Sequence, residues 1–452
     1  MEQQPNTHIA EPGMRNRYMR IVRLGWPILV GQLGMILTGF ADNIMVGRYS
    51  TEALASASFV NNVFNIAILA CIGFTYGVTP VIGAMFARGR YDDIGAEVRA
   101  SAVVNLLYSL LITAAMYGVY IALPHLGQPV QLLPLIKPYF LTHLAGVWAV
   151  GLFNVYSQWS YGVNDTKTPT VIALAANALN VAGNYALIYG NWGMPELGLT
   201  GAGLSTLLAR VVCPAAMFAV FRFARRNRVY HPGYRSARLT ARKALRIVRG
   251  SLPLSLQMAF ETGAFSGAAI IAGWLGAIQL AAFQIIIVVG MLGFCIYYSI
   301  GSATSVLVAH AAGRGSGREM RRMAWAGYHV MLAVMCVSSL VFVFFGRDLM
   351  GAFTDDRAVL TMAYTLIFPL VLYQLGDATQ ISFANSLRGT GHVGPMFLIA
   401  LVSYILVGLP STYLIAIPLG LGLRGIVFSF SVSLFLAGAL FLLTFLRATH
   451  RK

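Results

Sequence analysis

Three carboxylic acids stand inside long apolar segments of this chain: Asp42, Glu261 and Asp377. An ionised carboxylate at membrane depth is costly, and such residues usually line a cavity or an ion path. Polar or aromatic neighbours share their helical faces, because residues four apart lie one above the other. These neighbours are Thr38 before Asp42, Gln257 and Phe265 on either side of Glu261, and Tyr373 before Asp377. The residue types predict the binding of a cation or a proton within a membrane.

A second polar face is formed by three asparagines, Asn177, Asn180 and Asn184, at helical spacing. We expect Asn180 and Asn184 to lie near Asp42, with Thr206 of the next apolar segment close by. Carboxylate, amide and hydroxyl oxygens suit a hard monovalent cation or a proton rather than zinc or copper. Removal from water also favours the protonated form of a carboxylic acid. Coupling to Na⁺ and coupling to H⁺ are therefore both open.

The other polar residues of the apolar segments have less specific interpretations. Arg210 is the one basic residue inside such a segment, where it pairs with a helix end or an acid, or extends its charge to the membrane surface. His143 is interpreted as a hydrogen-bonded packing residue. Asn61, Asn62 and Asn65 line one side of their helix and are expected to face a cavity. Most of the remaining acids, Glu97 and Glu319 among them, are expected to be solvated in loops.

The elements that position these residues are predicted from composition. Of the 452 residues, 58% are hydrophobic and 10% are charged, whereas a typical soluble domain has about 25% charged residues. The mean hydropathy is +0.70. A bilayer core needs about 20 apolar residues per helix. We predict an all-α integral membrane protein with twelve transmembrane helices near 22–46, 53–87, 100–124, 135–161, 168–190, 200–221, 250–273, 279–311, 323–346, 358–387, 395–418 and 424–446.

The basic residues predict how the chain is oriented. Of the 32 Lys and Arg, 26 fall on one side of the predicted membrane, five on the other and one, Arg210, within a segment. Cytoplasmic loops collect Lys and Arg, so both termini are predicted to be cytoplasmic. The predicted parts are a tail 1–21, a first lobe 22–221, a basic linker 222–249, a second lobe 250–446 and a tail 447–452. Because the linker is expected to touch anionic lipid headgroups, a nucleic-acid partner is not expected.

The two lobes resemble each other in sequence. WPILVGQ at 26–32 aligns with LPLSLQM at 252–258, and GLTG at 198–201 aligns with GLRG at 422–425. Intervening glycines and prolines keep nearly the same shift across the whole lobe. Each lobe begins on the cytoplasmic side, so a pseudo-two-fold axis along the membrane normal should relate them. Transporters built from such parallel repeats place the substrate site between the lobes.

Several motifs resemble the MATE family (multidrug and toxic compound extrusion), and its NorM branch in particular. They are the first segment from Pro27 through Gln32 to DNIMVG at 42–47, LNVAGNYALIYG at 179–190, the segment of Glu261, DDRAVLTMA at 355–363 and YQLGDATQ at 373–380. The resemblance covers roughly residues 15–446. It implies a two-lobed antiporter of the bacterial inner membrane that expels amphipathic, mostly cationic drugs by rocker-switch alternating access. No cofactor is expected beyond the coupling ion, and one chain should suffice as a monomer.

The resemblance also implies roles for individual residues. Glu261, Tyr373 and Asp377 match the C-lobe cation site, with Na⁺ assigned to Glu261 and Asp377. Asp42, Asn180 and Asn184, with Thr206 beside them, match an N-lobe cation or proton site. Archaeal-type members carry an acid where this chain has Asn184, so a purely proton-driven N-lobe is not implied. Drug contacts are expected at Phe265, Gln284, Asp355 and Asp356, and at Gln257 beside Glu261.

Other functions fit the sequence less well. A flippase for lipid-linked saccharides of the same superfamily is the main alternative, but it would need a cationic cavity, and here three intramembrane acids face one Arg210. A membrane transferase would need a metal site of the DDxxD type. Neither Asp92-Asp93 nor Asp355-Asp356 is followed by a further acid at that spacing. An ATPase would need a GxxxxGK[ST] loop, which the sequence lacks. No enzymatic activity is expected.

Overall fold

The computed structural model describes residues 13–125, 129–351 and 356–450, and within these ranges the chain is helical without strands. Eleven helices are long and apolar enough to cross a membrane, and a pair bent by 52° passes the same test as a twelfth span. The predicted all-α architecture with twelve spans is confirmed. Each predicted segment coincides with one span, although most helices extend beyond the apolar residues by one or more turns.

The first half contains α1 to α7. Its helices are α1 (Met14–Tyr49), α2 (Thr51–Thr75), α3 (Val78–Ala87), α4 (Tyr91–Ala122), α5 (Leu133–Gly162), α6 (Lys167–Tyr189) and α7 (Gly198–Phe223), with short 3₁₀ turns η1 (Leu123–His125), η2 (Val130–Leu132) and η3 (Asn191–Gly193). The predicted 53–87 segment is interrupted at residues 76–77 and forms α2 and α3. The helix α1 starts inside the predicted tail 1–21.

The second half follows a short connection made of η4 (Arg225–Tyr230) and α8 (His231–Ser236). Its helices are α9 (Ala241–Leu275), α10 (Ala277–Gly313), α11 (Gly317–Gly351), α12 (Arg357–Tyr364), α13 (Ile367–Gly389), α14 (Met396–Ala400), α15 (Leu409–Ala416) and α16 (Gly422–His450), with a π-helical stretch η5 (Leu401–Gly408) between α14 and α15. The helix α9 begins inside the predicted linker 222–249, because its first two turns are polar and continue the helix outside the apolar segment.

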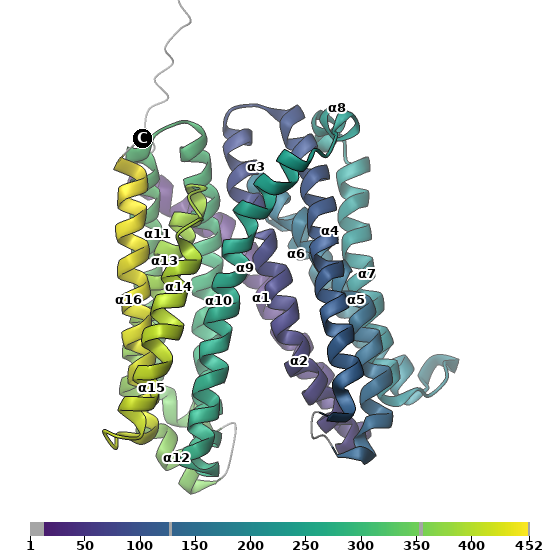
Figure 1. Ribbon diagram of the computed structural model, residues 1–452, viewed down its shortest axis with the longest axis vertical. Coiled ribbons are helices and arrows are strands. Elements are labelled where there is room, and N and C mark those ends of the chain that lie inside the picture. The colour runs from purple at the N-terminus through teal and green to yellow at the C-terminus, as the bar shows by residue number, and fades with distance from the viewer. Residues whose placement is uncertain (1–12, 126–128, 352–355, 451–452) are drawn as a thin grey trace, which may run out of the picture.

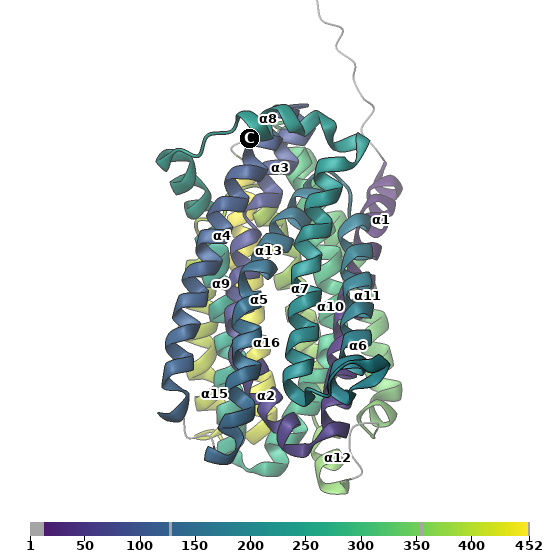
Figure 2. The ribbon, with the colours of Figure 1, turned by 90° about the vertical axis from the view of Figure 1, so that its right-hand side faces the viewer.

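The two halves lie side by side and approach each other at one end (Figure 1). That end carries α3 and α8, and it is called the linker end below. Toward the opposite end, where α12 and α15 lie, the halves diverge in the same view. Figure 2 shows the first half in front, with α4, α5 and α7 facing the viewer. The helices α1, α2 and α3 of the first half pack against α9 and α10 of the second.

Ion pairs and hydrogen bonds join the halves at the linker end. Arg17 of α1 binds Glu319 of α11 through two hydrogen bonds of 2.9 and 3.3 Å. Glu97 of α4 lies 2.7 Å from Arg246 and 3.6 Å from Lys243, both on α9. Glu97 is 3% exposed and Glu319 is 7% exposed. The expectation that these two acids are solvated loop residues is therefore wrong, because each is buried against a cation of the other half.

Close backbone approach between the halves depends on small residues. A Cβ atom on Gly313 would lie 2.5 Å from the carbonyl oxygen of Ala84, and one on Gly83 would lie 2.9 Å from the Cβ of Ala309. Beside them, Arg88 Nε donates to the Gly313 carbonyl at 2.7 Å. Small residues let helices in membranes pack closely through van der Waals contact and hydrogen bonds. The linker end is thus closed by backbone-to-backbone packing as well as by charge.

Removing the Arg17–Glu319 pair should loosen this closure. The substitution Glu319→Gln leaves a buried Arg17 without its carboxylate, a change that costs about 3–5 kcal/mol in buried pairs. We expect amide hydrogen exchange in α3 and at the end of α10 to accelerate by at least about a hundredfold. Glu52→Gln, which alters an exposed acid of α2, is the matched control. Equal exchange in both variants would show that the pair does not hold the halves together.

Candidate functional site

The first half assembles a polar cluster around Asp42 at the meeting of α1, α6 and α7. Asn184 Nδ2 donates to Asp42 Oδ1 at 2.5 Å. Asn180 Nδ2 donates to the same oxygen at 2.9 Å, while its amide oxygen accepts from Thr206 Oγ1 at 3.2 Å. The opposite orientation of the Asn180 amide leaves its oxygen facing only acceptors. The four residues that the sequence placed together are in contact, and Asn180 and Asn184 are buried.

Arg210 and His143 complete this neighbourhood. Arg210 interacts electrostatically with Asp42 and Tyr139, and its Nη1 is buried without a hydrogen-bond partner among the described residues. His143 Nδ1 lies 3.2 Å from the carbonyl oxygen of Tyr139. Its ring packs between those of Phe64 and Tyr139, with centroids 5.5 and 4.4 Å away. His143 is therefore the packing residue that was predicted, and Arg210 is the cation that balances Asp42.

The second half brings Glu261 of α9 close to Asp377 of α13. Their carboxyl groups interact electrostatically, and Tyr373 interacts with both. Asp377 is 3% exposed, and its Oδ2 has no hydrogen-bond partner in the described part of the chain. Two neighbouring carboxyl groups, one buried and one partly buried, cannot both be ionised at low cost unless a proton or a cation lies between them. The geometry of Glu261, Tyr373 and Asp377 therefore suits cation or proton uptake.

A row of buried polar groups on α13 was not anticipated from the sequence. Gln374 is fully buried, Gln380 is 2% exposed and Asn385 is 7% exposed. Each has a side-chain atom without a partner within the described ranges. The three-residue spacing of Gln374, Asp377 and Gln380 is the signal that could have revealed the row, because such residues share a helical face. Unsatisfied buried amides are costly, so this face suits water or an ion.

Part of that row borders a cavity of about 60 Å³ between the halves. Polar side chains from three helices and one helix break line it: Gln257 and Glu261 of α9, Tyr298 of α10, Gln380, Asn385 and Arg388 of α13, and Tyr76, which lies in the break between α2 and α3. Arg388 is 6% exposed, and its guanidinium carbon stacks 4.5 Å above the centroid of the Tyr76 ring. Tyr76 also shares a hydrogen bond with Tyr298 of α10. The cavity therefore reaches from Glu261 toward the linker end.

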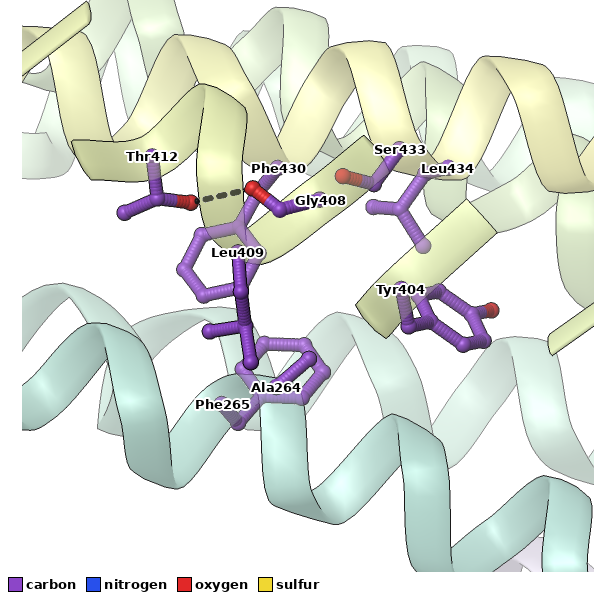
Figure 3. A pocket seen from close by; sticks show the side chains of 9 residues that line it. All are labelled: Ala264, Phe265, Tyr404, Gly408, Leu409, Thr412, Phe430, Ser433 and Leu434. Carbon is purple, nitrogen blue, oxygen red and sulfur yellow. Dashed lines mark hydrogen bonds between the residues drawn. The ribbon is translucent and has the colours of Figure 1, made fainter. Parts of the chain in front are cut away.

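An aromatic wall lies on the other side of Glu261. Phe265 stacks on Phe430 with centroids 4.7 Å apart, and Tyr373 meets both rings edge-on at 6.5 and 6.2 Å. Figure 3 shows Phe265 and Phe430 facing Leu409 in a small pocket of about 10 Å³, with Tyr404 at its edge. Such rings supply non-directional affinity for apolar and cationic groups.

The other residues predicted to contact drugs are spread over the second half. Gln257 is 8% exposed and borders the cavity with Glu261. Gln284 of α10 is exposed. Asp356 caps the N-terminus of α12, accepting from the Ala358 amide at 2.8 Å, and Asp355 lies outside the described residues. Since α13 alone rises about 15 Å between Ile367 and Asp377, Asp356 stands apart from the Glu261–Asp377 pair.

Asn61, Asn62 and Asn65 are all exposed near the middle of α2. Amides are disfavoured against lipid, so their exposure suits the predicted cavity-facing side.

No group of three His, Cys, Asp or Glu side chains that could hold a metal ion occurs in the ranges that the structure covers. The side chains of Glu261, Asp377 and Tyr373 instead offer oxygen atoms, which are the ligands that a hard cation such as Na⁺ prefers.

Comparisons with known proteins agree on one family. The family model described as MatE matches residues 27–186 and 253–414, so its two matches begin at Pro27 and Pro253, the prolines aligned in the internal repeat. A probable multidrug resistance protein NorM of Bradyrhizobium diazoefficiens is 28% identical over 99% of this chain and 97% of its own length. The multidrug resistance protein NorM of Vibrio vulnificus strain YJ016 is 26% identical over 93% of each chain.

Solved structures share the fold. An outward-facing multidrug resistance MATE family transporter of the MOP superfamily superposes with a TM-score of 0.86 at 20% identity, covering 96% of this chain and 97% of its own. The eukaryotic MATE transporter AtDTX14 gives a TM-score of 0.86 at 14% identity, covering 97% of this chain and 99% of its own.

Proposed function

This chain belongs to the MatE family, and from that membership we propose that it is a secondary active antiporter that exports amphipathic, mostly cationic organic compounds in exchange for Na⁺ or H⁺. Several relatives carry the name multidrug resistance protein. The observation that carries the proposal is the Glu261–Asp377 pair, in which a buried carboxylate oxygen lacks a partner among the described residues. A site of this kind binds positive charge and releases it when another cation arrives.

The proposed mechanism is competition between cations at the second half. An organic cation is held by Glu261 and Asp377, with Phe265 and Tyr373 supplying aromatic contact. A proton or Na⁺ arriving from outside neutralises the acids and weakens that hold. A ligand shifts the balance between two conformations only through its different affinity for them. The coupling ion would therefore favour one orientation of the halves and the drug the other. Gln257, Gln284, Asp355 and Asp356 are proposed to extend the drug surface.

Asp42 is proposed to form a second cation or proton site with Asn180, Asn184 and Thr206. The neighbouring Arg210 offsets the charge of Asp42, so this site would hold its ion less strongly than the Glu261–Asp377 pair. We assign it a supporting role in the first half, where it links α1 to α6 and α7. The two halves would then each contain one ion-responsive cluster.

The excess of Lys and Arg at the linker end supports its assignment to the cytoplasm. Both termini would then be cytoplasmic, in the inner membrane of a bacterium. We propose that the chain divides into lobes 22–221 and 250–446, a linker 222–249 and tails 1–21 and 447–452, with α1 and α9 each beginning several residues before its lobe. With the linker end closed, the present conformation corresponds to the outward-facing state of a rocker switch. A single chain supplies both lobes, so we propose a functional monomer.

Vesicle transport with separately imposed gradients tests the proposal. The purified chain would be reconstituted, and efflux of a fluorescent organic cation followed under a Na⁺ gradient at constant pH and under a pH gradient without Na⁺. We expect at least one gradient to drive efflux against the concentration of the dye, with vesicles lacking protein as the control. A response to Na⁺ alone assigns the coupling ion to Na⁺, and a response to pH alone assigns it to H⁺. Failure of both gradients would refute antiport.

A further inference from the structure

A basic cavity of about 490 Å³ lies at the linker end of the first half, away from the ion sites. Three parts of the chain form its walls: α1, the connection between α5 and α6, and η4. Its charged lining consists of Arg20, Arg23, Lys167, Arg226 and the single acid Asp165. Asp165 is already engaged by Arg226, at 2.6 Å. The remaining three cations face the same space.

These three cations lack anionic partners. In the described part of the chain, no carboxylate lies within salt-bridge distance of Arg20, Arg23 or Lys167. Arg20 is also close enough to Arg17 and Arg314 to be repelled by both, and the Glu319 carboxylate that attracts it is already bound by Arg17. Like charges gathered around one cavity raise its affinity for an anion. Arg20 is half-buried, so it cannot relieve the repulsion by turning fully into water.

The cavity stands above an apolar surface of the same helices. Trp26, three residues after Arg23 on α1, is 64% exposed, and Val171, four residues after Lys167 on α6, is also 64% exposed. Residues at these spacings share a helical face, and both helices run from the linker end into the apolar layer. Arg23 and Lys167 are therefore each followed, one turn deeper, by an exposed apolar side chain. This arrangement matches a phospholipid, with its phosphate among cations and its acyl chains below.

We propose that this cavity binds the phosphate group of an anionic phospholipid. Arg20, Arg23 and Lys167 hold the phosphate, while Trp26 and Val171 lie along the first carbons of the acyl chains. Because α1 also carries Arg17, which pairs with Glu319 across the halves, a lipid held here steadies the helix that closes the linker end. The lipid would thereby favour the conformation in which that end is shut.

Lipid binding by the purified full chain in detergent tests the proposal. A phosphatidylglycerol with a fluorescent acyl chain would be titrated, and then displaced by unlabelled phosphatidylglycerol, by phosphatidylcholine or by inorganic phosphate. We expect phosphatidylglycerol to displace the probe strongly, phosphatidylcholine weakly and millimolar phosphate not at all. Displacement by inorganic phosphate at concentrations like those of phosphatidylglycerol would overturn the lipid assignment in favour of a soluble phosphate.

A matched pair of double variants locates the site. Arg23→Gln with Lys167→Gln should weaken phosphatidylglycerol binding by about thirtyfold, since each cation near an anionic lipid contributes about a factor of five. Arg48→Gln with Arg424→Gln removes the same charge from exposed positions at the opposite end of the molecule and should change binding by less than about twofold. Equal losses in the two variants would mean that net charge alone attracts the lipid, and the proposal would fail.

Discussion

Replacing Asp377 with Asn should abolish drug efflux while leaving the protein folded in the membrane. The substitution keeps the shape of a buried side chain and removes one of the two carboxylates of the Glu261–Asp377 pair. The contact that is lost is the one between the Asp377 carboxylate and the coupling cation, and loss of one partner of such a desolvated pair of opposite charges costs about 2–5 kcal/mol. We therefore expect the affinity for the coupling ion, and with it the efflux rate, to fall by about a hundredfold or more. Efflux of a fluorescent organic cation from vesicles measures the loss.

Two controls separate this effect from misfolding. Asp348→Asn changes an exposed acid of the same half that forms no ion pair between described residues, and it should transport normally. Glu261→Gln should reproduce the defect of Asp377→Asn, and the double variant should be little worse than either, because the two acids act as one site. If Asp377→Asn transported at the normal rate with normal expression, the second-half site would be wrong.

Replacing Gly313 with Val should prevent the halves from closing at the linker end. The added Cβ would lie 2.5 Å from the Ala84 carbonyl oxygen, well inside contact distance, and the opposing atom is backbone. Overpacking a tight contact costs about 1–3 kcal/mol, which disfavours the closed state by about five- to 150-fold. We expect efflux to fall accordingly. A cysteine introduced in place of Ala309, which is fully buried beside Gly83, should be alkylated faster in the Gly313→Val variant than in the otherwise identical chain with Gly313.

Gly118→Ala is the control for a helical glycine without a close neighbour. A Cβ there meets nothing within 4 Å, and alanine favours a helix over glycine by about 1 kcal/mol. This variant should be at least as stable as the unaltered chain and should transport normally. Normal efflux in Gly313→Val would show that the halves can close with a gap at this contact. Close packing between the halves at the linker end would then not be required for transport.

The sequence predicted most of what lies within each half. Apolar runs located twelve spans, because the bilayer requires a continuous apolar surface on each. Helical spacing placed Asn180 and Asn184 on one face, and the structure confirms their contact with Asp42. These predictions succeeded because they rest on local periodicity and on the high cost of polar groups in lipid.

Contacts between the halves could not be predicted in the same way. Arg17 and Glu319 are 302 positions apart, and nothing in the local pattern around either residue indicates a partner. Glu97 follows two other acids in a loop-like stretch, which is also the pattern of a solvated surface. Gln374 and Asn385 were overlooked because neutral amides are inconspicuous beside carboxylic acids. Which side chains meet between the two halves depends on how the halves dock, and the hydropathy pattern does not predict docking.

The close packing of the two halves at the linker end affects where the membrane voltage falls. Close inter-half packing extends along the first half from Gly73, which contacts α9, to Ala84, which contacts Gly313. The eleven residue steps between them, helical except at the break at 76–77, rise about 16 Å, roughly half the thickness of a bilayer core. In the proposed outward-facing state, in which the space beyond this seal opens to solution, most of the membrane voltage would fall across the seal. An ion reaching Asp377 would cross little of the field. The voltage-sensitive step would be the opening of the linker end. The equilibrium affinity of this conformation for the coupling ion should therefore be nearly the same at every clamped membrane voltage.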